Sequence, residues 1–213
     1  MASDLLAFVE PWLASTDSSR LEGFEMVSRI NCPSSLNSYG SIVFSRNETI
    51  CDNINFNSIA IRNGHIDVTT WIVLGIEFVI IYSHPLIKFD ELMPMLSSLI
   101  QARSEVPTVI FGDFNMDLLC DKRLTKFFRD FLIKDRTPKI PSTDYGTKLD
   151  ACFTNIYGLD AWFYESIFSD HKPICMTVPK GTKLKLFDEL DDFLEDTVSP
   201  IKIQIVRNIS SLE

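Results

Sequence analysis

The chain has 213 residues, of which 46% are hydrophobic and 23% charged, and its formal net charge is −9. This composition excludes disorder throughout, and the acidic balance counts against binding nucleic acid through overall charge alone. The longest nearly unbroken apolar run, residues 71–82, contains Glu77 and is shorter than the roughly 20 residues that cross a bilayer, so no membrane span is predicted.

The N-terminus shows no pattern of a secretory signal. Its first basic residue is Arg20, and its apolar stretch over residues 5–9 is too short for such a signal. The five cysteines include no C-x-x-C pair, which disfavours a disulfide framework and a zinc site, and we expect them to be buried small hydrophobic residues. These features predict an intracellular protein, nuclear or cytoplasmic.

Predicted strands fill the first part of the chain. Residues 5–9 form a continuous apolar run, which is typical of a strand buried on both faces. Shorter strands are predicted over 24–30, 41–45 and 58–62, and a long hairpin is predicted over 66–73 and 76–82.

Helices enter in the second half. Apolar residues at helical spacing predict helices over 89–100, with Pro94 near the start, and over 122–133, while strands are predicted over 108–111, 149–153, 161–166 and 174–178. This order predicts an α/β domain over residues 1–180 with helices outside the sheet layers. Residues 181–213 are predicted to be a C-terminal extension with an acidic amphipathic helix, followed by an apolar segment over 201–209.

The tetrapeptide Gly112-Asp113-Phe114-Asn115 directly follows the predicted strand over 108–111. Asp113 and Asn115 can therefore face the same side of a cleft. Asp and Asn are also common turn residues, and a turn without a chemical role is the alternative interpretation of these four residues taken alone.

His171 is the one histidine of three that directly follows a carboxylate residue, in Ser169-Asp170-His171. We interpret His65 and His84 as surface or core residues. Asp150, at the start of a predicted strand, is expected to accept a hydrogen bond from the His171 imidazole and to fix its tautomer.

The polar residues singled out above share one placement. Together with Glu10 and Tyr82, they lie at predicted strand ends, where α/β folds assemble their active sites. The set consists of Glu10, Tyr82, Asp113, Asn115, Asp150, Asp170 and His171.

The order of these motifs resembles a known family. Glu-x-Trp, a strand ending in Tyr-x-x-Pro, Gly-Asp-Phe-Asn, Leu-Asp and Ser-Asp-His-x-Pro-Ile follow one another as in the endonuclease/exonuclease/phosphatase superfamily, typified by exonuclease III and deoxyribonuclease I. The motifs at 141–143 and 146–150 are most similar to the endonuclease domains of non-LTR retrotransposons and related mobile elements. The resemblance implies a four-layered α/β sandwich of two packed mixed β-sheets flanked by helices.

The resemblance also implies roles for the strand-end residues. Glu10 would hold Mg²⁺ or Mn²⁺, with Asp170 as a second ligand, because hard oxygen ligands suit these ions. Asp113, helped by Asn115, would orient or deprotonate the attacking water.

The remaining implied roles concern the phosphate. His171, held by Asp150, would donate to a non-bridging phosphate oxygen, and Tyr82 would contact the phosphate from the other side.

The chain departs from the family at its N-terminus. Family members begin with an earlier strand ending in Asn, whereas only residues 1–4 precede the first predicted strand here. We expect either a fragment of a larger protein or a decayed copy, with self-association through the exposed sheet edge. In the alternative, residues 201–209 supply a replacement strand.

Three functions remain open. The first is a metal-dependent DNA endonuclease of the mobile-element type, the second is a phosphodiesterase or phosphatase acting on a small phosphoester or lipid head group, and the third is an inactive remnant or interaction module. The candidate phosphate contacts for DNA, which a solvated helix face would explain equally well, are Lys122, Arg123, Lys126, Arg129 and Lys148.

Overall fold

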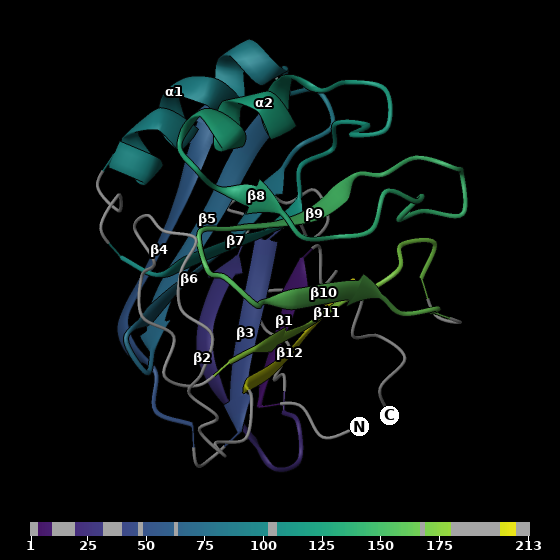
Figure 1. Ribbon diagram of the computed structural model, residues 1–213. Helices are drawn as coiled ribbons and strands as arrows, with labels where there is room; N and C mark the ends of the chain where they lie inside the picture. Colours follow the sequence, from purple (N-terminus) through teal and green to yellow (C-terminus); the bar gives the residue numbers. More distant parts are fainter. Residues whose placement is uncertain are drawn as a thin grey trace, which may run out of the picture.

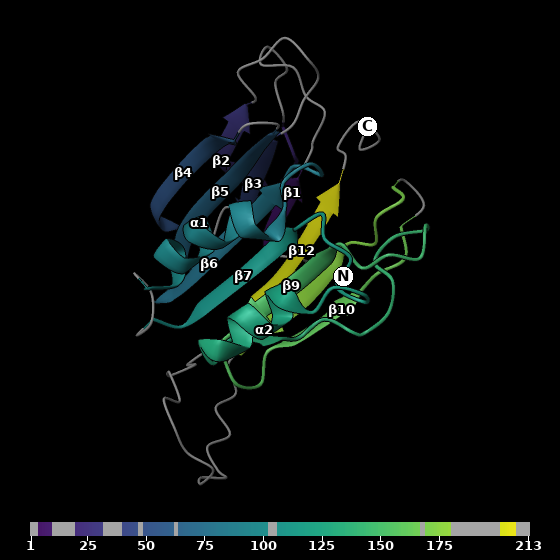
Figure 2. The ribbon, with the colours of Figure 1, turned by 90° about the horizontal axis from the view of Figure 1, so that it is seen from above.

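The computed structural model describes residues 4–9, 20–31, 40–46, 49–61, 64–101, 106–166, 169–179 and 201–207. Two six-stranded sheets pack face to face, and helices α1 (Phe89–Gln101) and α2 (Arg123–Asp130) lie against the outer face of one of them (Figures 1 and 2). This architecture confirms the predicted α/β sandwich of two packed mixed sheets, and both described helices lie on one side of it. No helix in the described ranges has the length and apolar character needed to span a membrane.

The sheet beneath the helices, called sheet B, carries most of the predicted site. Its order is β4 (Asp52–Ile61), β5 (Gly64–Val73), β6 (Ile76–Ser83), β7 (Thr108–Asp113), β9 (Asp150–Thr154) and β8 (Lys134–Asp135). Strands β6 and β7 are parallel, and every other neighbouring pair is antiparallel. Because β6 and β7 run in the same direction, with α1 as the connection between them, their carboxyl ends lie at the same edge of the sheet.

The second sheet, called sheet A, contains both the first and the last described strand. Its order is β10 (Asp160–Phe163), β11 (Ile174–Val178), β12 (Ile201–Arg207), β1 (Leu5–Val9), β3 (Gly40–Arg46) and β2 (Phe24–Asn31). Strand β12, yellow in Figure 2, pairs in parallel with β1 and antiparallel with β11. Of the alternatives for the C-terminal segment, the structure therefore agrees with an added strand, which covers residues 201–207 and joins two halves of the sheet.

Two apolar layers hold the domain together. Side chains from sheet A, such as Leu5 and Val43, pack against Trp71 and Phe111 of sheet B to fill the space between the sheets. A second layer lies between sheet B and the helices. Strand β6 contributes to both layers because its side chains alternate between the two faces, which explains its unbroken apolar sequence.

The helix predicted over 122–133 ends earlier in the structure, at Asp130. Leu132 has a φ of 61°, and the amide of Ile133 donates back to the Phe128 carbonyl at 3.0 Å, so the chain reverses into β8. Phe131 and Leu132 are consequently 39% and 60% exposed, whereas their helical spacing predicted that they lie on the buried face of the helix. The helical spacing of apolar residues in the sequence extends beyond the residue at which the chain leaves the helix and turns toward the sheet.

Other predicted features need smaller corrections. Strand β4 begins at Asp52, upstream of the predicted start, and β10 ends at Phe163. Among the described cysteines, Cys152 is buried, whereas Cys120 is exposed, so the prediction that all are buried was wrong. The predicted acidic helix after residue 180 lies outside the described residues.

Candidate active site

A row of polar residues crosses the inner face of sheet B. In the strand register, Asp67 of β5 is opposite Tyr82 of β6, Tyr82 is opposite Asp113 of β7, and Asp113 is opposite Asp150 of β9. Cross-strand neighbours project from the same face of a sheet. The register therefore gathers Tyr82, Asp113 and Asp150, which are far apart in sequence, at one edge of the space between the sheets.

The tetrapeptide that ends β7 owes its conformation to specific contacts. Gly112 has a φ of 142°, and a Cβ there would lie 1.9 Å from the carbonyl oxygen of Ile81, so this position requires glycine. Phe114 is fully buried and packs edge-on against neighbouring rings beneath the helices. Asp113 is also fully buried, and its Oδ1 accepts a hydrogen bond of 2.9 Å from the Asn115 amide.

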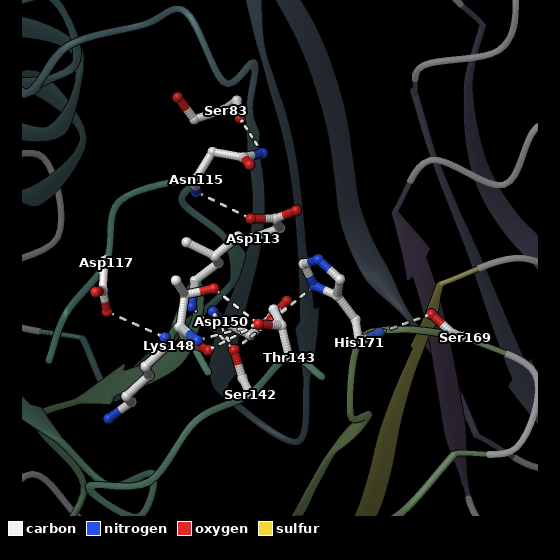
Figure 3. A network of polar contacts seen from close by, with 12 residues as sticks. Ser83, Asp113, Asn115, Asp117, Ser142, Thr143, Lys148, Asp150, Ser169 and His171 are labelled. Atoms are coloured by element: carbon white, nitrogen blue, oxygen red, sulfur yellow. Dashed lines mark hydrogen bonds and ion pairs between the residues drawn. The ribbon is translucent and has the colours of Figure 1, made fainter. Parts of the chain in front are cut away.

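Asn115 is fixed at both its backbone and its side chain. Its φ is 49°, a left-handed conformation that Asn tolerates, and its Nδ2 donates to the Ser83 carbonyl at 2.8 Å (Figure 3). Asp113 and Asn115 are thus held beside the ends of β6 and β7, and the turn has a defined orientation relative to both strands.

The predicted hydrogen bond between His171 and Asp150 is present. His171 Nδ1 lies 2.8 Å from Asp150 Oδ2, and both residues are buried (Figure 3). Ser142 Oγ donates to the same carboxylate oxygen at 2.8 Å and accepts from the amides of Leu149 and Asp150. The carboxylate, which accepts from Ser142, orients the imidazole and fixes its tautomer.

The backbone around His171 is clamped to the segment that precedes β9. Thr143 and His171 form an isolated antiparallel bridge, the Lys172 amide donates to the Ser142 carbonyl at 2.7 Å, and the Asp144 amide donates to the Asp170 carbonyl at 2.9 Å. Since residue 174 begins β11 of sheet A, His171 and Asp150 meet where the two sheets approach each other.

Three of these side chains could share a cation. Ligand atoms of Asp113, Asp150 and His171 all lie within 4.8 Å of one another, and all three residues are buried. The two carboxylates give the cluster the oxygen donors that Mg²⁺ and Mn²⁺ prefer. The donor set therefore fits a hard divalent cation.

The remaining predicted site residues lie in different surroundings. Tyr82 is fully buried and its ring centroid lies 5.5 Å from that of His65. Asp170 is exposed, and among the described residues it does not belong to the cluster of cation ligands. Glu10 lies outside the described residues. The metal-binding roles of Glu10 and Asp170 remain predictions.

Asp67, the first member of the polar row, was not predicted. Burial raises the pKa of its carboxyl group, while Ser58 and His65 lower it in part. His65 Nε2 lies 3.5 Å from Asp67 Oδ2. Since Asp67 is the one carboxylate of β5 and lies between Ile66 and Val68, its position in the sequence could have indicated that the strand approaches a polar site.

The predicted phosphate contacts differ in whether they form ion pairs and in whether they line a pocket. Arg123 is paired with Asp121 at 2.7 Å, its guanidinium lies over the Phe89 ring, and its hydrogen bond lowers the pKa of Asp121. Lys148 is only 2% exposed and pairs with Asp135 at 2.7 Å. The members that line one surface pocket are Lys122, Lys126, Arg129 and Lys148.

Ser142 is a second candidate site residue that sequence reasoning missed. It is fully buried and makes three hydrogen bonds around Asp150, yet the sequence shows only a serine in a polar segment. The similarity of the motif at 141–143 to mobile-element endonucleases was the one signal that could have identified it.

Solved structures provide the comparison with known proteins. No model of a protein family matches the sequence, and no curated protein matches it. The endonuclease domain of TRAS1, a telomere-specific non-LTR retrotransposon, is 13% identical with a TM-score of 0.55, over 85% of this chain and 86% of that one. Cytolethal distending toxin from Actinobacillus actinomycetemcomitans is 13% identical with a TM-score of 0.56, over 81% and 84%.

An endonuclease/exonuclease/phosphatase family protein from Leptotrichia buccalis gives a similar result. It is 16% identical with a TM-score of 0.53, and the match covers 80% of this chain and 85% of that one. The chain therefore shares the fold of these three solved structures, which is the fold that the resemblance in the motifs implies.

Proposed function

We propose that the protein is a metal-dependent phosphodiester hydrolase that cuts DNA, of the type found in mobile elements. The observation that carries the proposal is the convergence of Asp113, Asp150 and His171, whose ligand atoms lie within 4.8 Å of one another at the edge of two packed sheets. Two carboxylates and an oriented imidazole are the groups that phosphodiester hydrolysis needs from a protein.

Each side chain has a role that follows from its contacts. Asp113, with Asn115 beside it, orients the attacking water and accepts its proton. His171 donates a hydrogen bond to a non-bridging phosphate oxygen, where negative charge accumulates during attack. Because Nδ1 donates to Asp150 at 2.8 Å, Nε2 is the imidazole nitrogen that faces the phosphate, and it donates when the ring carries a proton on both nitrogens, a form that the adjacent Asp150 carboxylate favours.

The cation would be held by carboxylates beside the cluster of Asp113, Asp150 and His171, with Glu10 and Asp170 as the ligands that the resemblance implies. Bound Mg²⁺ or Mn²⁺ would offset the charge of the phosphate and polarise it toward in-line attack. The protein's part is to keep the carboxylates and the imidazole in fixed positions around the phosphate.

A second candidate is hydrolysis of a small phosphoester by the same residues. The net charge of −9 favours it, because an acidic chain repels a long polyanion more strongly than a small one.

The deciding experiment compares plasmid nicking with hydrolysis of bis(p-nitrophenyl) phosphate by the full chain, in Mg²⁺ and in EDTA. We expect nicking that needs the cation and falls about 10²–10⁴-fold in His171→Ala and in Asp113→Ala. Asp144→Asn is the matched control, because it changes an exposed carboxylate near the site. Thermal unfolding would show that each variant folds.

The outcomes separate the three functions. Small-phosphoester hydrolysis without nicking would replace the DNA substrate with a smaller one. Nicking that is equal in the wild type and both site variants would refute the site. Absence of both activities in a folded, cation-loaded protein would favour an inactive remnant or interaction module.

A further inference from the structure

A pocket of about 340 Å³ lies against helix α2, separate from the candidate active site. The pocket, called the α2 pocket, is closed by the chain around β8 and by residue 148, and leucines from the preceding loop form part of its wall. Its charged lining residues are Lys122, Lys126, Arg129, Asp135, Lys139 and Lys148.

The charge of the α2 pocket is opposite to that of the chain. Five basic side chains face one carboxylate, a net charge of +4, whereas the whole chain carries −9. Asp135 is already paired with Lys148 at 2.7 Å. No carboxylate in the described part of the chain forms an ion pair with Lys126, Arg129 or Lys139. The pocket therefore concentrates uncompensated positive charge.

The pocket suits a phosphate group. Arg129 supplies a planar fork of donors that matches phosphate oxygens, and the lysines supply point charges on long stems. The buried Lys148–Asp135 pair forms a fixed base, since Lys148 is 2% exposed and its Nζ also donates to the Thr137 carbonyl.

The position of Lys148 relates the pocket to the candidate active site. Lys148 and Asp150 are two residues apart, and Figure 3 shows the Lys148 side chain directed away from His171 while the Asp150 carboxylate faces it. The Lys148 amide is held by Asp117 Oδ1 at 3.1 Å. One short segment therefore carries the two sites on its opposite sides.

We propose that the α2 pocket binds a phosphate group of the DNA backbone at a distance from the bond that is cut. The choice of DNA as the source of the phosphate rests on the proposed function. The phosphate chemistry rests on the pocket itself, and a free phosphoester would offer the same group.

The test measures binding without turnover. Anisotropy of a labelled DNA duplex in EDTA would give Kd for the wild type, for Lys126→Glu/Arg129→Glu, and for a matched control, Lys88→Glu/Lys134→Glu. The control makes the same change in net charge at exposed lysines outside the pocket. We expect the pocket variant to raise Kd about tenfold or more and to lower the salt slope by about one unit, with a much smaller effect in the control.

A second titration, with inorganic phosphate and with a mononucleotide, identifies the source of the phosphate. If the pocket variant loses binding of these ligands but binds DNA as the wild type does, the DNA assignment is overturned in favour of a free phosphoester. Equal losses in the pocket and control variants, or an equal loss in Arg123→Glu, would overturn the pocket as a site.

Failure of the catalytic proposal gives a different result. The change Lys126→Glu/Arg129→Glu should raise Kd in EDTA by the same factor in the His171→Ala background as in the wild type, because the α2 pocket lies on the other side of the Lys148–Asp150 segment. An inactive protein that still shows the pocket-specific change in Kd would refute the nuclease and keep the phosphate site.

Discussion

Two ion pairs flank the same short segment of chain, and they have different consequences. On one side Asp150 faces His171 at 2.8 Å, and on the other Lys148 faces Asp135 at 2.7 Å. The side chains of Asp150, His171 and Lys148 are each less than a tenth exposed, and that of Asp135 is 14% exposed. Length and burial alone would not distinguish a chemical pair from a structural one.

The difference lies in side-chain chemistry and in a third partner. An imidazole can gain and lose a proton near neutral pH, whereas an ammonium ion offers donors only. The Asp150–His171 pair also converges with Asp113, within 4.8 Å, while the Lys148–Asp135 pair ends at a pocket with no further carboxylate. We therefore expect loss of the first pair to remove activity and loss of the second to reduce stability.

Deleting residues 201–213 should affect the protein most, because it removes β12 and leaves β11 with one neighbour in place of two. His171 lies three residues before β11, so the Asp150–His171 pair should be disrupted, whereas the Lys148–Asp135 pair, which joins the residues just before β9 to β8, is spared. We expect nicking to be lost and Tm to fall by about 10 °C, measured by circular dichroism. Deletion of 208–213 is the control, and equal Tm values for the two deletions would contradict the role of β12.

Breaking the Asp150–His171 pair should mainly reduce activity, whereas breaking the Lys148–Asp135 pair should mainly reduce stability. Asp150→Asn should lower nicking about 10²–10⁴-fold with a small change in Tm. Lys148→Met should lower the free energy of unfolding by about 3–5 kcal/mol in denaturant titrations, because the Asp135 carboxylate loses its cation. The double variant Lys148→Met/Asp135→Leu should recover most of this stability, and a double variant as unstable as Lys148→Met would disprove the pairing energetics.

Ser142→Ala tests whether the support of Asp150 matters to chemistry. It removes a donor to the carboxylate and an acceptor for two amides. We expect kcat to fall about tenfold with KM little changed, and stability to fall by about 1–3 kcal/mol. Ser98→Ala, an exposed serine of α1, is the matched control. A loss of stability without any loss of kcat would assign Ser142 a purely structural role.

Asp67 extends the comparison to a third buried carboxylate, and it should give the smallest effect. Burial raises the pKa of Asp67 in the folded state, so the folded protein binds more protons there than the unfolded chain does. Asp67 therefore contributes stability below the pKa that its carboxyl group has in the unfolded chain. This contribution is lost as pH rises through the pKa of the same group in the folded protein. Relative to the wild type, Asp67→Asn should therefore become more stable as pH rises from 3 to 7. A constant difference in unfolding free energy across that range would contradict this account.

The candidate site could be predicted from sequence where local pattern and strand ends agreed. Asp113 and Asn115 follow a buried strand, and Asp150 and His171 were expected to pair, as the structure confirms at 2.8 Å. Ser142 and Asp67 could not be predicted in this way, because their importance depends on which distant side chains the strand register brings beside them.

The sequence by itself determined most of the strands, the two described helices and the position of residues 112–115 at the end of a buried strand, since these depend on short-range periodicity. Tertiary structure alone decided where α2 ends, that β12 inserts in parallel beside β1, and that Lys148 is buried against Asp135 instead of exposed. Those outcomes depend on contacts between residues that are far apart in the chain, and no local pattern specifies such partners.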